Sequence, residues 1–202
     1  MQRVMWTISF YITYVGERMS NTISQETHYP VMVDMYQQFN TLLDQYHQKH
    51  SRIFPVRFDL RYPQDSMNNH SNTDISNCMF KIAQNFRRKG ADPVYAWVRE
   101  VKDSHNPHYH CLLLLNGQKK RNINEVYDVA SRLWSSTIQN DAPGLLDRCN
   151  KRGLNGVMLN RNDESNPTQI EHVKRQISYM AKHNDKAHHK DNLRNYGMSR
   201  LH

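Results

Sequence analysis

The sequence predicts an α+β fold in which helices pack on one antiparallel sheet. Residues 53–62 alternate apolar and charged side chains, which is typical of a strand with one face in the core. Residues 95–115 contain two apolar runs separated by a polar turn, which indicates a hairpin of two more strands. Apolar residues recur every three or four positions in four expected helices, at residues 30–49, 74–89, 122–138 and 168–183. With a short buried strand at residues 156–160, this order matches a ferredoxin/RRM-like antiparallel sheet with the last helix laid across it.

The first strand divides its side chains between two faces and ends at Pro63. Successive side chains of a strand point to opposite faces, so the apolar and charged residues separate. The face toward the core carries Val56, Phe58 and Leu60, and the opposite face carries Arg57, Asp59 and Arg61.

The hairpin carries a candidate metal site. His108 and His110 are two positions apart in the second apolar run, so both imidazoles point to the same face of the strand. The connection between the runs is rich in Asp, Ser, Asn and Pro, so the first strand should return beside the histidines and bring Glu100 close to them. Two imidazoles and one carboxylate suit a divalent ion with open coordination positions, so we expect Glu100, His108 and His110 to converge on one exposed spot at the sheet. His105, three positions before His108, is an alternative third ligand.

The expected helix at residues 168–183 carries a tyrosine that its packing does not require. At about 100° per residue, Val173, Ile177 and the other apolar side chains share one side of the helix. Tyr179 lies about 200° from Ile177 by the same rule and is therefore expected on the polar side. Lys182, three positions later, is expected on a neighbouring part of that face, where its ammonium can reach a phosphate or a phenolate.

The charge balance indicates a polyanionic partner. The chain of 202 residues has 27 Lys and Arg against 19 Asp and Glu, a formal net charge of +8, and this excess lies after residue 50. Nucleic acid is the first expectation and an anionic membrane the second. The three cysteines, Cys78, Cys111 and Cys149, are too widely spaced for a zinc knuckle or a disulfide framework and fit a reducing cytoplasm.

We expect three regions. Residues 1–50 should form an N-terminal extension, residues 51–184 the main domain, and residues 185–202 a basic C-terminal tail. The apolar run in residues 1–20 is interrupted by Thr and Ser and is too short to span a bilayer, so no membrane is expected. That run is either a docked strand, helix or leader, a degenerate signal, or the product of a translation start set too early. His188 and His189 in the tail can bind a metal, although contact with a DNA backbone is the preferred interpretation.

Three motifs in the same order resemble those of HUH endonucleases, the rolling-circle replication initiators and relaxases of phages, plasmids and other mobile elements. "PHYH" at residues 107–110 is similar to the His-hydrophobic-His motif that gives the family its name, with Tyr109 in the middle position. "DLRYP" at residues 59–63 resembles the first strand motif of the family, and "YMAK" at residues 179–182 resembles its nucleophile motif. The resemblance covers roughly residues 52–184.

The resemblance implies a metal-dependent nickase and strand transferase for DNA. Glu100, His108 and His110 would hold Mg²⁺ or Mn²⁺ on the scissile phosphate, Tyr179 would attack phosphorus to give a 5′-phosphotyrosine, and Lys182 would assist. The expected partner is single-stranded DNA or an extruded origin hairpin in a bacterial cytoplasm. A separate helicase is also expected, because the sequence contains no Walker A motif. Residues expected to contact DNA are Arg57, Arg61, Arg99, Lys102, Arg175 and Lys186.

Several alternatives remain open at this point. A single-tyrosine transposase or relaxase would use the same residues, whereas a metal-dependent hydrolase would use water in place of Tyr179. A non-catalytic origin-binding module would keep the sheet and need neither the metal nor the tyrosine. Tyr196 invites comparison with two-tyrosine members of the family, but it follows Tyr179 by seventeen positions in a different sequence context, which favours a one-tyrosine enzyme.

Overall fold

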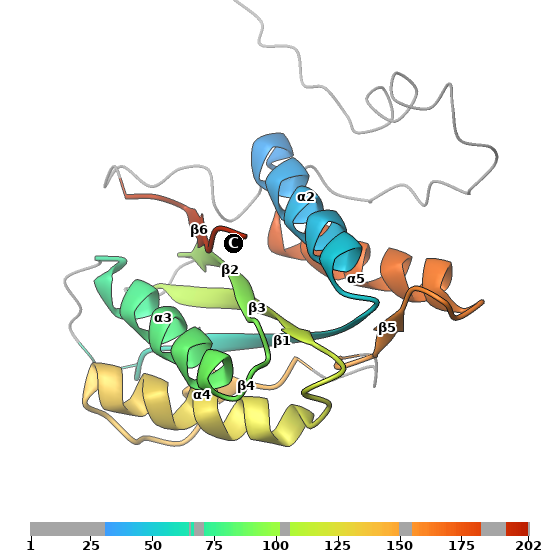
Figure 1. Cartoon of the computed structure of the whole chain (residues 1–202). Coiled ribbons are helices and arrows are strands. Elements are labelled where there is room, and N and C mark those ends of the chain that lie inside the picture. Colours follow the sequence, from blue (N-terminus) through green and yellow to red (C-terminus); the bar gives the residue numbers. More distant parts are fainter. Residues whose placement is uncertain are drawn as a thin grey trace, which may run out of the picture.

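The computed structural model describes residues 31–64, 66, 71–101, 106–149, 155–182 and 193–201, which form a six-stranded antiparallel sheet with helices on both faces (Figure 1). The strands run in the spatial order β4-β1-β3-β2-β6, and β5 also pairs with β1. Their bounds are β1 Arg52–Arg61, β2 Val94–Glu100, β3 His108–Asn116, β4 Leu146–Asp147, β5 Leu159–Asn160 and β6 Tyr196–Met198. The expected α+β fold with an antiparallel sheet is therefore confirmed.

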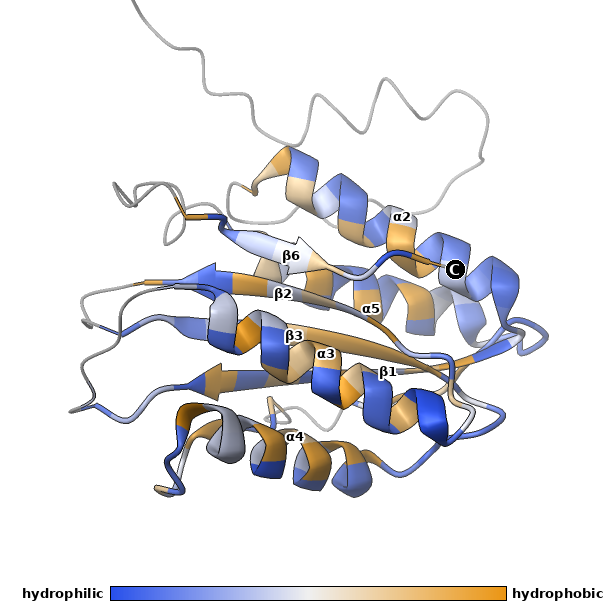
Figure 2. Cartoon of the chain, turned by 60° about the vertical axis from the view of Figure 1, so that its left-hand side comes forward, coloured by the Kyte–Doolittle hydropathy of each residue, from blue (hydrophilic) through white to orange (hydrophobic). Residues whose placement is uncertain are grey.

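The sheet separates two layers of helices. On one face lie α3 (Thr73–Arg88) and α4 (Ile123–Ile138), and on the other lie α2 (Val33–Lys49) and α5 (Asn166–Met180) (Figure 2). β3 lies between β1 and β2, and the helices α3 and α4 connect the strands in the split βαβ pattern of a ferredoxin-like fold. Both faces of the central strands are therefore covered.

Strand alternation divides β3 between the two layers. Tyr109, Cys111, Leu113 and Leu115 belong to the core under α3 and α4, while Leu112 and Leu114 belong to the core under α2 and α5. By the same alternation His108 and His110 point toward the α2 and α5 side. The histidine pair therefore lies on the face covered by α2 and α5, whereas Tyr109 and Cys111 lie in the core under α3 and α4.

The outer edge of β1 is completed by a side chain. β5 pairs with the beginning of β1 and β4 with its end, which leaves Arg57 between them. The amide of Asn155 fills this gap, since its Oδ1 accepts the Arg57 N–H at 2.8 Å and its Nδ2 donates to the Arg57 carbonyl. A side-chain amide thus provides the donor and acceptor that a neighbouring strand would otherwise supply, and it fixes the backbone at Arg57.

The N-terminal helix belongs to the core. The predicted stripe of residues 30–49 is buried on α2, and Met35, Phe39 and Tyr46 are 0% exposed. Tyr46 also donates a hydrogen bond of 2.7 Å to the Asp92 carbonyl, and His50 Nε2 lies 2.7 Å from the Asp92 carboxylate. The described part of the expected N-terminal extension is therefore an integral layer of the domain.

The C-terminal region differs from the expected basic tail. Residues 196–198 form β6, which pairs with residues 96–98 of β2 and extends the sheet. β4 was also not predicted, because residues 146–147 lie in a stretch without a strand pattern and become a strand only by pairing with β1. β5 is confined to two residues of the expected strand, and α5 ends at Met180 instead of continuing to residue 183.

The close packing of β6 on β2 can be tested at Gly197. A Cβ atom at this position would lie 2.6 Å from the ring of Trp97, which is 4% exposed. We expect Gly197→Ala to lower the free energy of unfolding by about 1–3 kcal/mol, because overpacking forces a buried ring to move. Urea unfolding of the full chain measures this change.

The matched control for this test is Arg200→Ala, since Arg200 follows β6 and is exposed. Equal stability of the Gly197→Ala variant, Arg200→Ala and the wild type would show that β6 does not pack on Trp97 as described.

Candidate active site

Three potential metal ligands meet where β2 ends and β3 begins. Glu100 is the last residue of β2 and lies directly opposite His108, the first residue of β3. Ligand atoms of Glu100, His108 and His110 all lie within 4.8 Å of one another, so this group can hold a metal ion. Glu100 Oε2 lies 2.8 Å from His108 Nε2 and 2.5 Å from His110 Nε2. We call these three residues the metal cluster.

The metal cluster is less accessible than the sequence suggested. Glu100 is 5% exposed and His110 is 4% exposed, while the side chain of His108 is 22% exposed. An exposed spot was expected for all three residues. Because α2 and α5 cover this face of the sheet, only the His108 side of the cluster opens toward solvent.

A second carboxylate supports His110 and was not predicted. Asp59 on β1 lies directly opposite His110, and its Oδ1 is 2.8 Å from His110 Nδ1. A carboxylate at Nδ1 keeps the proton on that nitrogen and leaves Nε2 free to bind a metal. The sequence placed Asp59 on the polar face of its strand, but only the strand register shows that His110 is its partner.

Both carboxylates remain ionised in this environment. Burial raises the pKa of Glu100, but hydrogen bonds with His108 and His110 and the charges of these residues outweigh burial and hold the pKa well below its usual range. Burial also raises the pKa of Asp59. The hydrogen bond with His110 and the charges of His110 and Arg57 outweigh burial, so the pKa of Asp59 lies below its usual value. Glu100 is therefore available as a charged metal ligand, and Asp59 as a charged acceptor for His110 Nδ1.

Tyr179 lies beside the metal cluster. The apolar side of α5 packs on the sheet, with Val173 at 2% exposure and Ile177 at 0%, whereas Tyr179 is 48% exposed. The placement of Tyr179 off the apolar face therefore agrees with the prediction. Its ring centroid is 6.0 Å from that of His110, in an edge-to-face arrangement. The helix that buries Ile177 thus brings the phenol ring against a candidate ligand.

Arg57 lies between Tyr179 and Asp59. Its Cζ is 4.8 Å from the centroid of the Tyr179 ring, within the usual range of a cation–π contact. Its Nη2 is 3.6 Å from Asp59 Oδ1 and 3.4 Å from His110 Nδ1. With its side chain only 13% exposed, Arg57 is part of the site and not of the outer surface.

The other predicted residues are dispersed. Arg61 lies opposite His108 with its side chain 50% exposed, and it pairs with Asp147 at 3.7 Å. Arg175 is exposed on α5, one turn before Tyr179. Lys182 lies beyond the end of α5, where its backbone forms an isolated bridge with Val31, so helical geometry does not set its position.

Arg99 is not available to contact DNA. It is 1% exposed and lies opposite Tyr109, on the α3 and α4 side of the sheet. The expectation of a phosphate contact at Arg99 is therefore wrong, and alternation with Glu100 was the signal that could have corrected it. Lys102, Lys186, His105, His188 and His189 lie outside the described residues.

Tyr196 does not point its hydroxyl at the metal cluster. It is in register with Val98 on β2, and Val98 is in register with His110. The Tyr196 hydroxyl accepts a 2.8 Å hydrogen bond from Gln38, and its ring packs against Phe39 on α2 with centroids 5.8 Å apart. Tyr196 is therefore engaged with α2.

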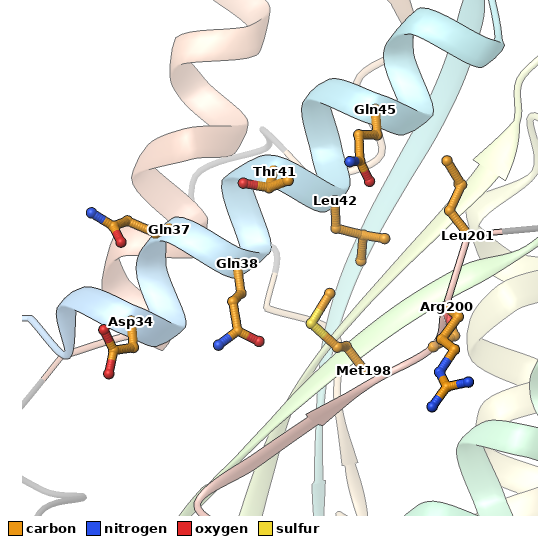
Figure 3. A pocket seen from close by; sticks show the side chains of 10 residues that line it. Asp34, Gln37, Gln38, Thr41, Leu42, Gln45, Met198, Arg200 and Leu201 are labelled. Atoms are coloured by element: carbon orange, nitrogen blue, oxygen red, sulfur yellow. The ribbon is translucent and has the colours of Figure 1, made fainter. Parts of the chain in front are cut away.

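A cavity lies elsewhere, between α2 and the segment after β6 (Figure 3). It has a volume of about 680 Å³, and its lining includes Gln37, Gln38, Gln45 and Met198. No member of the metal cluster lines it. The cavity therefore does not identify the chemistry of the site.

The sheet, the two helix layers and the Glu/His/His cluster define an α+β domain with a candidate metal centre. Residues 16–199 match the family described as YagK/YfjJ C-terminal domain, and the chain belongs to that family. Comparisons with curated proteins and with solved structures found no match. None of the described helices has the length and apolar character needed to cross a bilayer.

The role of Asp59 gives a testable prediction about the cluster. Asp59→Asn keeps the size of the side chain but removes the charge opposite His110 Nδ1, so we expect affinity for Mn²⁺ to fall by about 10- to 100-fold. Isothermal titration of the full chain with Mn²⁺ measures the change. Asp147→Asn is the control, since Asp147 lies opposite Asp59 on β4 and outside the metal cluster. Equal Mn²⁺ affinity in both variants would contradict the role of Asp59.

Proposed function

We propose that this protein is a metal-dependent DNA nickase and strand transferase with Tyr179 as its nucleophile. The observation that carries the proposal is the contact between the Tyr179 ring and His110, a member of the metal cluster. An exposed tyrosine next to two histidines and a carboxylate is the combination that the resemblance to HUH endonucleases implies. The proposed substrate is single-stranded DNA or an extruded hairpin, and the proposed role is initiation of rolling-circle replication of a phage or mobile element.

The proposed reaction has two steps. The oxygen of Tyr179 forms a bond to phosphorus, the bond from phosphorus to the 3′ oxygen breaks, and the phenol proton passes to solvent while the departing 3′ oxygen takes up a proton. The products are a 5′-phosphotyrosine and a free 3′-hydroxyl. A 3′-hydroxyl can later attack the phosphotyrosine, which restores the DNA strand and the tyrosine.

Each residue of the cluster has a distinct proposed role. Glu100, His108 and His110 would hold Mg²⁺ or Mn²⁺, which supplies Lewis acid polarisation of the scissile phosphate when bound. Asp59 orients His110 by accepting a hydrogen bond from its Nδ1–H. Two imidazoles and one carboxylate leave coordination positions for phosphate oxygens and suit ions of this type better than a closed structural zinc site does.

The surface charge supports a DNA substrate. The chain has a formal net charge of +8. Arg61, opposite His108 on the sheet, and Arg175 on α5 are both exposed. These residues are proposed to contact phosphates, and Lys182 to assist Tyr179. A separate helicase and a bacterial cytoplasm are the proposed context. A transposase or relaxase would use the same site, whereas an origin-binding module would have no use for the contact between Tyr179 and His110.

The decisive test is formation of a covalent adduct. We expect full-length protein with labelled single-stranded DNA and Mn²⁺ to give a protein–DNA band on denaturing gels. Tyr179→Phe should abolish both the band and nicking, because it removes the attacking oxygen but keeps the ring. The DNA should include candidate origins from the genome that encodes the protein, since an initiator needs its own site.

Tyr196→Phe is the matched control, because it removes one phenol oxygen from the same face of the sheet. It should retain the adduct, since the Tyr196 hydroxyl bonds to Gln38. Nicking at the wild-type rate by Tyr179→Phe would assign the reaction to water or another nucleophile and would refute the proposal.

The proposed phosphate contacts predict a specific dependence on salt. Binding of single-stranded DNA should weaken as salt rises, because cationic side chains displace counterions from phosphates. Arg175→Gln should reduce the slope of log affinity against log salt by about 0.7, the value for one contact to a single strand. Fluorescence anisotropy on the Tyr179→Phe background measures binding without cleavage. An unchanged slope would remove Arg175 from the DNA surface.

A further inference from the structure

We propose that Arg57 is a positioning residue for Tyr179 and not a contact to the DNA backbone. In this inference, which rests on the proposed function, the guanidinium holds the phenol ring in place. It also stabilises the negative charge that the phenol oxygen carries while its bond to phosphorus forms or breaks.

The geometry places the cation on the ring and away from solvent. Arg57 Cζ is 4.8 Å from the Tyr179 ring centroid, and the Arg57 side chain is 13% exposed although Tyr179 itself is 48% exposed. A side chain that follows a DNA backbone needs its charged group at the surface. The guanidinium of Arg57 instead lies under the ring, between Tyr179 and β1, the strand that carries both Arg57 and Asp59.

Arg57 is fixed at both of its ends. Asn155 binds the N–H and the carbonyl of Arg57 at the open edge of β1. At the other end Nη2 lies 3.6 Å from Asp59 Oδ1 and 3.4 Å from His110 Nδ1. These constraints keep the guanidinium under the ring before any substrate arrives, so little reorganisation is needed during the reaction.

The pairing with Asp59 does not by itself explain the buried guanidinium. The distance of 3.6 Å is longer than that of a charge-assisted hydrogen bond, and the buried Arg57 Nε has no hydrogen-bond partner among the described residues. Asp59 has a much closer partner in His110, at 2.8 Å. Beside this loose ion pair, the guanidinium lies against the aromatic face of Tyr179, with 4.8 Å from Cζ to the ring centroid.

The chemistry explains why a cation at this position is useful. When the oxygen of a tyrosine attacks phosphorus or leaves it, negative charge develops on the oxygen and spreads into the ring. A cation over the ring face attracts that charge, and the attraction is stronger in a partly buried site than in water. The phenol and its phosphate ester carry no such charge, so Arg57 should accelerate both directions without changing their equilibrium.

The experiment compares Arg57→Met with Arg175→Met in the full chain. Both substitutions remove a guanidinium and keep an unbranched apolar side chain, but Arg57 lies under the ring and Arg175 is exposed one turn before Tyr179. Adduct formation and rejoining are measured in single turnovers with Mn²⁺ and a defined single-stranded DNA. The measured quantities are both rate constants, the half-saturating DNA concentration and the fraction of adduct at equilibrium.

For Arg57→Met we expect both rate constants to fall by about 10- to 30-fold, the size of a partly desolvated cation–π contact. The half-saturating DNA concentration and the equilibrium fraction of adduct should remain unchanged. For Arg175→Met we expect the opposite, with a raised half-saturating concentration and an unchanged rate at saturation. Arg57→Lys should recover part of the lost rate, because it restores a positive charge but not the planar group.

Several outcomes would overturn the inference. A raised half-saturating concentration with normal rates would make Arg57 a DNA contact, and equal rates in Arg57→Met and Arg57→Lys would show that its charge has no role. Mn²⁺ titration and thermal unfolding of each variant exclude loss of the site or the fold, and Arg57→Lys carries the test if Arg57→Met unfolds. Absence of an adduct in the wild type would instead refute the proposed function. An adduct in the wild type with normal rates in Arg57→Met would refute this inference alone.

Discussion

The candidate site depends on a single buried imidazole that joins three neighbouring strands. His110 on β3 contacts Asp59 on β1 through Nδ1 and Glu100 on β2 through Nε2. Buried charged groups are costly unless each has a partner, and here one ring lies between two carboxylates. The contact of Nδ1 with Asp59 fixes the orientation of the ring and leaves Nε2, the nitrogen that faces Glu100, to a metal ion. The metal cluster is therefore a consequence of how the central strands align.

The helix layer over this face determines which reactive group reaches the imidazole. The start of α2 and the end of α5 are joined by a backbone hydrogen bond of 2.8 Å from Met32 to Ala181, next to the bridge between Val31 and Lys182. With Ile177 buried on the sheet, the last turn of α5 has little freedom to rotate. Tyr179 is consequently held beside His110, although its own side chain is half-exposed. Membership in the YagK/YfjJ C-terminal domain family adds no chemistry to this description, so the proposed activity depends on these contacts.

The sequence by itself determined the features that depend on local periodicity. A period of two placed His108 and His110 on one face and assigned the charged face of β1, and a period of 3.6 predicted the buried stripe of α2 and the polar position of Tyr179. The polar turn after Glu100 predicted the hairpin and therefore the meeting of Glu100 with the histidines. Strand alternation also predicts that Arg99 points to the face opposite that of Glu100, where it is buried.

Only the tertiary structure decided the features that depend on which segments pair. Asp59 became the partner of His110 through the register of β1 on β3, which no local pattern specifies. Residues 146–147 and 196–198 carry no strand pattern of their own. They form the short strands β4 and β6 because they pair with the edges of β1 and β2. Arg57 and Tyr179 are 122 positions apart in the sequence. They meet because α5 packs across β1 and β3. Periodicity fixes the direction of a side chain within its element, whereas its neighbours follow from long-range packing, which depends on the whole chain.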